Sequence, residues 1–532
     1  MKRVTIISIL MLLPIAMFSQ NAMDVYNISS SQIRGTARYV SMGGAFTSLG
    51  GDPSAIVQNP AGIGVYRSSE VSASMGGQWT ANSSANAETA KKGAFTFDNL
   101  SLITTFFTGK SSGLVNFNLG VTYNRNQSYK RKYNAVTPEL NASFTNYLET
   151  VTNGIPSTDL VVTDQKDSYY DTSSPWLSIL GYQSYLISPD YDGASTYYGL
   201  FTPGQSTGSS YTTILEDGRN DEYTINFGGN VSDRFYFGLA LGIRDFSVTR
   251  NIYYTEDLYN TQGVYVDKNN QEQDIASANY QYYTYYNMRG IGFNGKFGII
   301  ARLTDNFRLG ATIHTPTFFN IDQSMDAAVD NKLIIKQTRE EIDEYQQTPA
   351  VATNTIKIRT PWSFQVGASY VAGKRAIISA DYQYVAYNNV KMKESNGDDF
   401  PIENEFYKAC FKSGHTVKAG LEFRATNALS LRAGYALQLS PIKADLKDVN
   451  VEVPTAGMQT MYMLPGNGSY YSGGIGYKFK VCYLDFAYQH YTQKSDLFAY
   501  SPILSNGVEL IPASSEIKTK QNSITFTFGL KF

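Results

Sequence analysis

Alternation of apolar and polar side chains is the dominant pattern along this chain. In its cleanest example Val115, Phe117, Leu119, Val121 and Tyr123 interleave with asparagine, threonine and glycine. A period of two is that of a β-strand, and this composition suits a wall between lipid and water. The same pattern predicts fourteen strands, which begin near residues 71, 95, 115, 223, 235, 291, 307, 362, 376, 417, 429, 473, 482 and 524.

The connections between these strands alternate in length. Tight turns follow the even-numbered strands, as at residues 232–233 and 426–427, whereas long segments follow the odd-numbered ones, and the longest covers residues 126–221. Outer-membrane barrels have short periplasmic turns, long extracellular loops and an even number of strands. The sequence therefore predicts an all-β fold, a 14-stranded antiparallel transmembrane β-barrel formed by residues 70–532.

One strand departs from regular alternation. Its apolar residues stand on odd positions from Phe235 to Ile243, but Phe246 and Val248 stand on even ones. A single extra residue would restore the phase. We therefore expect a β-bulge after Arg244, near the outer rim of the barrel.

The chain before residue 70 has two predicted parts. Lys2 and Arg3 precede an apolar run and then small or polar residues, which predicts a signal peptide over residues 1–20 and export from the cytoplasm. Residues 21–69 are rich in glycine and do not alternate. Because a barrel this wide would leave an aqueous lumen unless filled, we expect residues 21–69 to form an N-terminal hatch, or plug, inside it.

Composition agrees with a barrel and excludes several classes of function. Tyrosine (41) and phenylalanine (29) are abundant, and mean hydropathy is only -0.27, as expected where each strand alternates. The net charge of -2 gives no sign of nucleic-acid binding. Cys410 and Cys482 are too few for a disulfide framework. His314, His415 and His490 lack metal-ligand spacing, so we expect no cofactor and no enzymatic activity.

The hatch segment carries a family resemblance. The stretch Gly35-Thr36-Ala37-Arg38-Tyr39-Val40-Ser41-Met42-Gly43-Gly44-Ala45, then Gly51-Asp52 and Asn59-Pro60-Ala61-Gly62, resembles the hatch of the FadL/TodX family of outer-membrane transporters for long-chain fatty acids and other hydrophobic compounds. Later segments agree in order. The resemblance implies capture of a hydrophobic ligand outside, an internal binding site, and lateral release through the wall.

The same resemblance suggests gating residues. In the family a kink in the third strand faces the hatch triplet, here Asn59, Pro60 and Ala61. Gly120 is the natural place for that kink, since a glycine within a strand often marks a bulge or a close backbone approach. The alternative is that Gly120 only makes room for the hatch.

Two helices are expected in the loop at residues 126–221. One begins at residues 137–139 and stops at Gly154, and the second begins at residues 174–175. Their apolar faces either pack on each other or leave a cleft that captures ligand, together with the loop at residues 317–355. The candidate capture residues are Phe144, Leu148, Trp176, Leu177 and Leu180.

A ligand carboxylate would need an arginine or lysine partner. Parity with apolar neighbours places Lys296, Asp381, Lys418, Glu422 and Arg432 on the lumen side. We take Arg432 and Lys418 as candidates for that partner, beside the alternative that they only line the lumen.

The expected partners follow from an outer-membrane location in a Gram-negative bacterium. They are a hydrophobic small-molecule ligand, outer-membrane lipid including lipopolysaccharide, and the barrel-assembly machinery, which would bind the C-terminal aromatic Phe532. We expect a monomer. Two other functions stay open: a surface adhesion or recognition barrel whose tyrosine-rich loops bind a partner, and a barrel lipase that uses His490 and Ser495.

Overall fold

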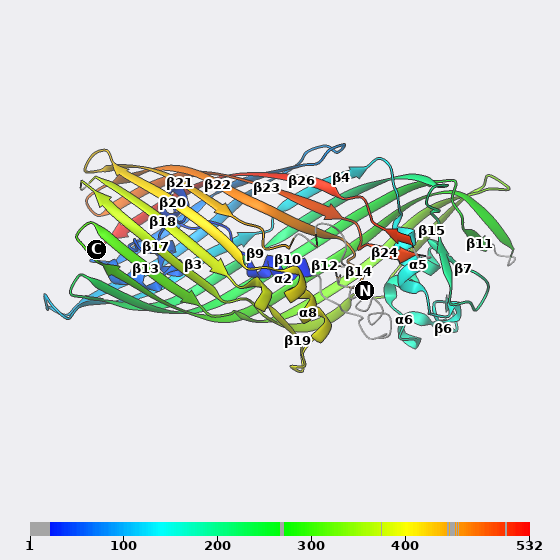
Figure 1. The fold of residues 1–532 in the computed structure, drawn as a ribbon, viewed down its shortest axis with the longest axis horizontal. Helices are drawn as coiled ribbons and strands as arrows, with labels where there is room; N and C mark the ends of the chain where they lie inside the picture. Colours follow the sequence, from blue (N-terminus) through cyan, green and yellow to red (C-terminus); the bar gives the residue numbers. More distant parts are fainter. Residues whose placement is uncertain are drawn as a thin grey trace.

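The wall of the protein is a closed antiparallel sheet (Figure 1). A computed structural model describes residues 22–266, 271–373, 375–443, 446, 453, 455, 457–505 and 508–532. The predicted signal peptide, residues 1–20, lies outside the described residues. The sheet closes because β1 (Glu70–Ser83) pairs with β26 (Ser515–Lys531) from Glu70↔Lys531 onward. Fourteen wall strands are present, which confirms the predicted barrel.

Several wall strands consist of two segments separated by a short irregularity. Between β1 and β26 the wall contains β2 (Ala90–Phe107), β3 with β4 (Leu114–Ser128, Arg131–Thr137), β9 (Thr207–Val231), β10 (Phe235–Tyr259), β12 (Glu272–Arg302), β13 with β14 (Phe307–His314, Phe318–Ile335), β16 with β17 (Ala352–Arg359, Ser363–Ala372), β18 with β19 (Ala376–Val385, Lys391–Glu394), β20 (Gly414–Arg424), β21 (Leu429–Gln438), β22 (Tyr462–Lys478) and β23 (Cys482–Phe498).

The wall rises far above the bilayer on one side. Strands β9 and β10 have 25 residues each and β12 has 31, whereas a membrane crossing needs about 9–11. The loops are therefore shorter than the sequence predicted. Most of residues 126–221 is strand, and only residues 138–206 leave the wall, while residues 317–355 form β14, β15 (Glu341–Gln347) and the start of β16. The prediction of a capture loop at 317–355 is therefore wrong.

The change of phase after Arg244 is not a bulge. Strand β10 pairs without a register shift with both neighbours over its whole length. Odd-numbered residues face outward throughout the strand. Ile243 therefore faces lipid, whereas the even-numbered Phe246 and Val248 face inward and are buried. The preferred face of apolar side chains therefore inverts where the strand leaves the bilayer. Above that level water lies outside, and an apolar core lies inside.

That core is closed by a lid, residues 138–206, at the extracellular end (Figure 1). The lid contains α5 (Phe144–Thr152), η2 (Ser157–Asp159), β5 (Val162–Thr163), β6 (Lys166–Asp167), α6 (Ser168–Asp171), α7 (Trp176–Gln183), β7 (Ile187–Pro189) and β8 (Tyr197–Gly199). The smaller elements elsewhere are β11 (Val264–Val266), η3 (Tyr387–Asn389), α8 (Pro401–Cys410), β24 (Ile503–Ser505) and β25 (Val508–Leu510). Among the described residues, no helix is long and apolar enough to cross a bilayer.

The two lid helices pack on each other. Helix α5 begins at Ser143, whose capping box with Asn146 fixes the start six residues after the predicted Thr137. Leu148 approaches Gly181 of α7 so closely that a Cβ there would lie 3.1 Å from its Cδ1. Four of the candidate capture residues are buried, and Trp176 is half-buried; the four are Phe144, Leu148, Leu177 and Leu180.

Glu256 of β10 ties the lid to the wall. Its carboxylate is fully buried and accepts hydrogen bonds from Ser143 Oγ, from the Phe144 amide at 3.0 Å, and from Tyr254 and Tyr280 at 2.5 and 2.6 Å. Burial raises the pKa of Glu256, and the hydrogen bonds oppose that rise. The Glu256 carboxylate thus provides the hydrogen-bond acceptor for two donors at the start of α5 and for two buried tyrosine hydroxyls.

We expect Glu256→Ala to loosen the lid while leaving the barrel intact. Each buried donor left without an acceptor costs about 1–3 kcal/mol, and four donors lose theirs. Limited proteolysis within residues 138–206 should accelerate by roughly tenfold or more, while heat-modifiable gel migration of the barrel stays unchanged. Glu394→Ala, at an exposed position, is the control. Equal cleavage of both variants would contradict this role.

Candidate functional site

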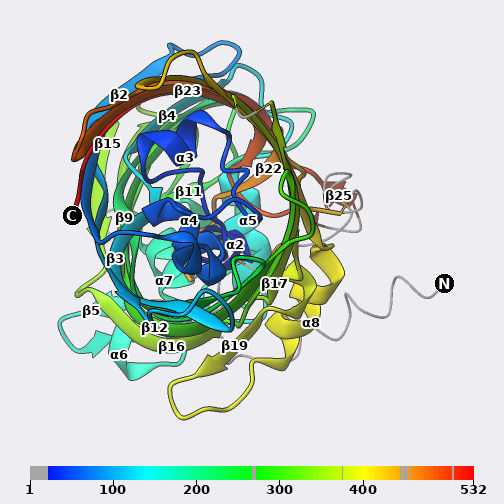
Figure 2. The same cartoon turned by 90° about the vertical axis from the view of Figure 1, so that its left-hand side faces the viewer.

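The N-terminal hatch fills the lower lumen. It contains α2 (Ala22–Ser29), α3 (Ala37–Ser41), α4 (Pro53–Gln58) and η1 (Pro60–Val65), which lie inside the ring of strands (Figure 2). The predicted triplet docks on β10 and β12. A Cβ at Gly238 would lie 2.2 Å from the Pro60 carbonyl carbon, and one at Gly298 would lie 1.8 Å from Asn59 Oδ1. These glycines let the hatch backbone reach the wall.

The third strand has no kink at Gly120. Gly120 pairs with Ile103 of β2 and with Asn226 of β9, and neither ladder shifts register there. A Cβ at Gly120 would lie 2.9 Å from Ile63 Cδ1 of the hatch. The alternative interpretation of Gly120, that it makes room for the hatch, therefore fits the structure, whereas the predicted kink at this position is wrong.

Buried charges clamp the hatch to the wall. Arg38 of the hatch donates to Glu422 at 2.8 Å, and Arg432 donates to the same carboxylate at 2.7 Å and to Asp485 at 2.6 Å. On the neighbouring strand Asp381 accepts bonds from the amide and hydroxyl of hatch Thr47 at 2.8 and 2.7 Å. Arg432 is thus already neutralised by two carboxylates.

The structure places both predicted ligand cations in this clamp. Lys418 is buried and stands opposite Asp381 in the β18–β20 ladder. The other lumen-facing charges inferred from parity are buried as well, and Lys296 donates to the hatch carbonyl of Val57 at 3.0 Å. Neither Arg432 nor Lys418 lines the cavity above the hatch. Alternation thus placed these charged residues correctly on the lumen side, but it did not identify the groups that they contact there.

A cavity of about 100 Å³ lies between α2 and the upper wall. Its charged lining consists of Asp24, Arg131, Glu216 and Arg250, and its apolar lining includes Tyr133, Ile214, Ile252, Met461, Tyr470, Tyr491 and Leu497. Arg250 donates to Asp24 at 3.0 Å and to Glu216 at 2.9 Å. Burial raises the pKa of Asp24, and Glu216 nearby adds to that rise.

Arg131 differs from the other charges of this cavity. It pairs in register with Glu216, which Arg250 already engages. Among the described residues Arg131 forms no ion pair, and its guanidinium lies 5.7 Å from the centre of the Tyr129 ring. Arg131 is therefore the cation in the cavity lining whose charge is not already paired with a carboxylate. Sequence analysis did not identify Arg131, because the residues of β4 fall within the predicted long loop at 126–221.

The wall is interrupted beside this cavity. The β2–β3 ladder ends at Asn99↔Asn124. Beyond that point residues 90–98 pair with β1 on one side, and residues 125–137 pair with β9 on the other. Within these described segments no backbone ladder joins the two edges, and we call this interruption the seam.

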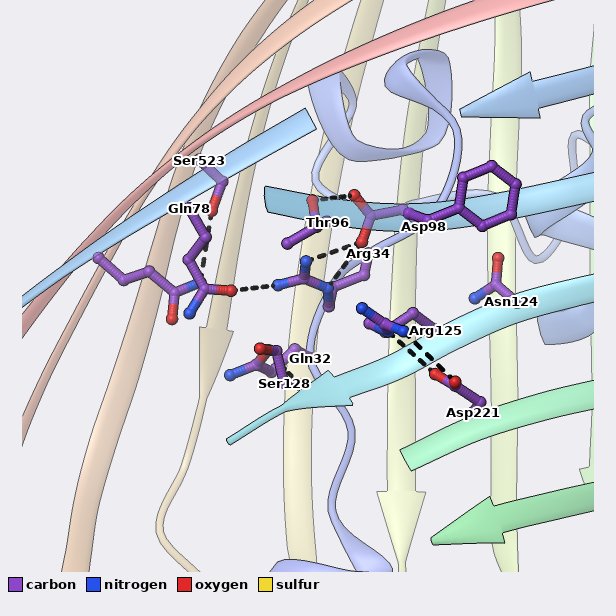
Figure 3. A network of polar contacts seen from close by, with 12 residues as sticks. Gln32, Arg34, Gln78, Thr96, Asp98, Asn124, Arg125, Ser128, Asp221 and Ser523 are labelled. Atoms are coloured by element: carbon purple, nitrogen blue, oxygen red, sulfur yellow. Dashed lines mark hydrogen bonds and ion pairs between the residues drawn. The ribbon is translucent and has the colours of Figure 1, made fainter. Parts of the chain in front are cut away.

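Side chains and the hatch close the seam (Figure 3). A bulge in β2 turns both Asp98 and Asn99 inward, and Arg34 of the hatch donates to Asp98 at 2.7 Å and to Gln78 at 2.7 Å. The Gln32 amide donates to the Asn126 carbonyl at 2.9 Å. Since Gln32 also lines the cavity, hatch residues 32–34 stand between the cavity and the seam.

The outer side of the seam faces apolar surroundings and one bridging charge. Phe95 of β2 is 69% exposed, and Phe97 packs on Tyr123 with ring centres 5.6 Å apart. Lys92 of β2 reaches across to the Glu216 carbonyl at 3.1 Å, whereas Arg125 pairs with Asp221 at 3.0 Å on the far side of the seam, within the β3–β9 ladder. The contacts across the seam are made by side chains, so they can part without any loss of strand pairing.

The residues suggested for a lipase do not form a catalytic pair. His490 lies on the outward face of β23 and contacts Asn522 at 2.8 Å, whereas Ser495 is buried on the inward face. Among the residues that the structure describes, no cluster of three His, Cys, Asp or Glu side chains is arranged to hold a metal ion.

Comparison with known proteins gives matches only among solved structures. No protein-family model matches the chain, and no curated protein does. A Pseudomonas aeruginosa FadL homologue is 10% identical, with 95% of this chain and 100% of that chain covered and a TM-score of 0.51. The Pseudomonas putida toluene transporter TodX is 12% identical over 95% and 100%, with a TM-score of 0.47.

The likeness to the FadL homologue covers 95% of the chain. It agrees with the hatch motif found in the sequence, and the closed wall, the apolar outer face and the filled lumen agree with it independently. At the level of the fold, this chain is similar to the FadL homologue: it is a fourteen-strand antiparallel barrel whose lumen is filled by an N-terminal hatch.

Proposed function

We propose that the protein is an outer-membrane channel for the passive uptake of small hydrophobic compounds, either long-chain fatty acids or aromatic hydrocarbons. The ligand would enter the cavity above the hatch and leave sideways through the seam. The observation that carries the proposal is the adjacency of the two: Gln32 of the hatch and Gln127 and Arg131 at the edge of the seam all line the partly apolar cavity.

The shape of the lumen favours a lateral exit. The straight path to the periplasm is filled by α3, α4 and η1, which the clamp at Glu422 and Asp381 holds to the wall. The seam needs no strand pair to break. Because Phe95 and Phe97 border it on the outside, a ligand that passes it would meet the apolar region of the outer leaflet.

The cavity would have to enlarge before it holds such a ligand. Small-molecule sites usually have volumes of about 300–1,000 Å³, several times the present space. Helix α2 is the element that would move, since it covers the cavity. It is held by the Asp24–Arg250 pair, by Tyr26, whose ring lies 5.3 Å from that of Tyr387, and by hydrogen bonds from wall side chains to two of its carbonyls. In this proposal α2 and residues 32–34 are the gate, and the clamped remainder stays in place.

A ligand with an acid group would pair with Arg131. The guanidinium is half-buried in the lining of a partly apolar cavity and forms no ion pair with any described residue, and charge-assisted hydrogen bonds are strong in such surroundings. We propose Arg131 in place of Arg432 and Lys418.

Adhesion is the alternative function. It is favoured by exposed tyrosines on the lid and upper wall, among which Tyr191 is 71% and Tyr170 is 62% exposed. Large aromatic side chains of this kind are frequent at protein interfaces. Transport assays separate the two functions, because an anchor for a binding surface needs no working seam.

Cross-linking the seam should stop uptake. In a Cys410→Ser/Cys482→Ser background, Lys92→Cys and Asp217→Cys replace a pair whose Nζ and Oδ2 lie 3.6 Å apart across the seam. A cleavable bismaleimide should abolish uptake of labelled fatty acid and aromatic hydrocarbon, and reductant should restore it.

The matched control is Lys494→Cys with Glu516→Cys, a pair 3.2 Å apart across the continuous β23–β26 ladder. Its cross-linking should leave uptake unchanged. Undiminished uptake through a cross-linked seam would refute lateral release. If a strain without the protein takes up these compounds at the same rate, transport itself is refuted and adhesion takes its place.

Arg131→Gln should weaken binding of a fatty acid by roughly tenfold, as expected for one charge-assisted hydrogen bond. Binding of the fatty alcohol with the same chain should not change. Displacement of a fluorescent fatty acid from the purified barrel measures the affinity for the acid and for the alcohol. Lys418→Gln is the comparison variant. A selective loss of acid binding in Lys418→Gln and not in Arg131→Gln would return the role to the residue predicted from the sequence.

A further inference from the structure

A group of four basic side chains stands on the outer face of the wall at the level where it leaves the bilayer. We call it the basic patch: Lys357 and Arg359 of β16, and Lys391 and Lys393 of β19. All four side chains are half-buried or exposed. This patch lies on the outside of the barrel, away from the cavity and from the seam.

Strand register places the patch beside the upper lipid-facing residues of the neighbouring strands. One cross-strand row runs through Ile243, Phe293, Phe318, Arg359 and Lys391. Ile243 and Phe318 are the last lipid-facing apolar residues of their strands, Phe293 is followed only by Ile291, and Phe293 and Phe318 are 59% and 58% exposed. The two cations therefore follow directly where contact with acyl chains ends.

The next row confirms this placement. It runs through Asp245, Ile291, Asn320, Lys357 and Lys393, so polar side chains have largely replaced the apolar ones. Below the patch Trp362 and Phe364 stack with ring centres 6.4 Å apart. Aromatic girdles of this kind mark the membrane interface of outer-membrane barrels.

The cations of the patch oppose one another. Lys357 is directly opposite Lys393, and Arg359 is directly opposite Lys391, an arrangement that destabilises a sheet. Only Lys393 has a carboxylate partner among the described residues, Asp399 at 3.1 Å. Arg359 Nε is buried without a hydrogen-bond partner. The protein thus holds four like charges together at the lipid surface and compensates only one of them with a carboxylate among the described residues.

We infer that the basic patch binds the phosphate of an outer-leaflet lipid, the lipid A part of lipopolysaccharide. Arginine and lysine are the side chains that phosphate groups prefer, and basic pockets at the membrane surface bind lipid head groups. The acyl chains would lie against Phe318 and Phe364, and the phosphate would relieve the repulsion between the opposed cations. This inference does not rest on the proposed transport function.

Native mass spectrometry of the purified barrel with bisphosphorylated lipid A tests the site. The wild type should bind it and should not bind dephosphorylated lipid A. The variant K357Q/R359Q/K391Q should bind lipid A at least roughly fivefold more weakly. A roughly fivefold loss of affinity is that expected when one cation near a charged lipid surface is removed. The charge-conserving variant K357R/R359K/K391R should bind as the wild type does.

The matched control is R424Q/K478Q/K480Q, which removes three exposed cations at the periplasmic turns. It should bind lipid A unchanged, and both glutamine variants should keep the heat-modifiable gel migration of a folded barrel. Equal affinity of K357Q/R359Q/K391Q and wild type would overturn the site. So would an equal loss in the control, or displacement of lipid A by an equal concentration of inorganic phosphate, which would indicate a site for free anions.

Discussion

The structure depends on one constraint: inside lipid, every backbone N–H and C=O must find its partner within the protein. Closure of β1 on β26 meets that demand around the whole circumference at the level of the lower bilayer. At the seam the ladder between β2 and β3 ends. There bulges, inward-turned polar side chains and a hatch backbone bond from Gln32 to Asn126 take its place. An interruption of this kind in a transmembrane wall needs a reason, and passage of a ligand provides one.

The hatch is held unevenly, and the unevenness indicates which part can move. Its body is fixed by wall carboxylates that accept from Arg38 and Thr47, and by glycines that let the backbone approach. Its first helix lies beside a cavity and is held by one ion pair, one aromatic cluster and two hydrogen bonds from wall side chains to its carbonyls. The link between the two parts, Arg34, is bound to the edge of the seam. Movement of α2 would therefore act directly on the contact that closes the wall.

The same wall serves two environments along its length. In the bilayer its apolar side chains face outward and the lumen is polar. Above the bilayer they face inward and build a core under the lid, while the outer face becomes polar. Glu256, buried within that core, shows how the lid is attached, and the basic patch shows how the outer face changes at the boundary.

The sequence by itself determined the strand positions, the side of each turn, the hatch and the lumen-facing charges, because period-two alternation and turn residues are local properties. It misplaced the start of α5 and took the inversion at Arg244 for a bulge, since apolar side chains can face either lipid or a lid. Only the tertiary structure decided that Arg432 contacts the carboxylate that holds the hatch, that Arg131 forms no ion pair with a described residue, and that strand pairing in the wall is interrupted beside Asp98 rather than at Gly120. Each of these three features depends on which segments, distant in the sequence, meet across the lumen. Alternation along one strand shows which residues face the lumen, but it does not show which residues lie opposite them.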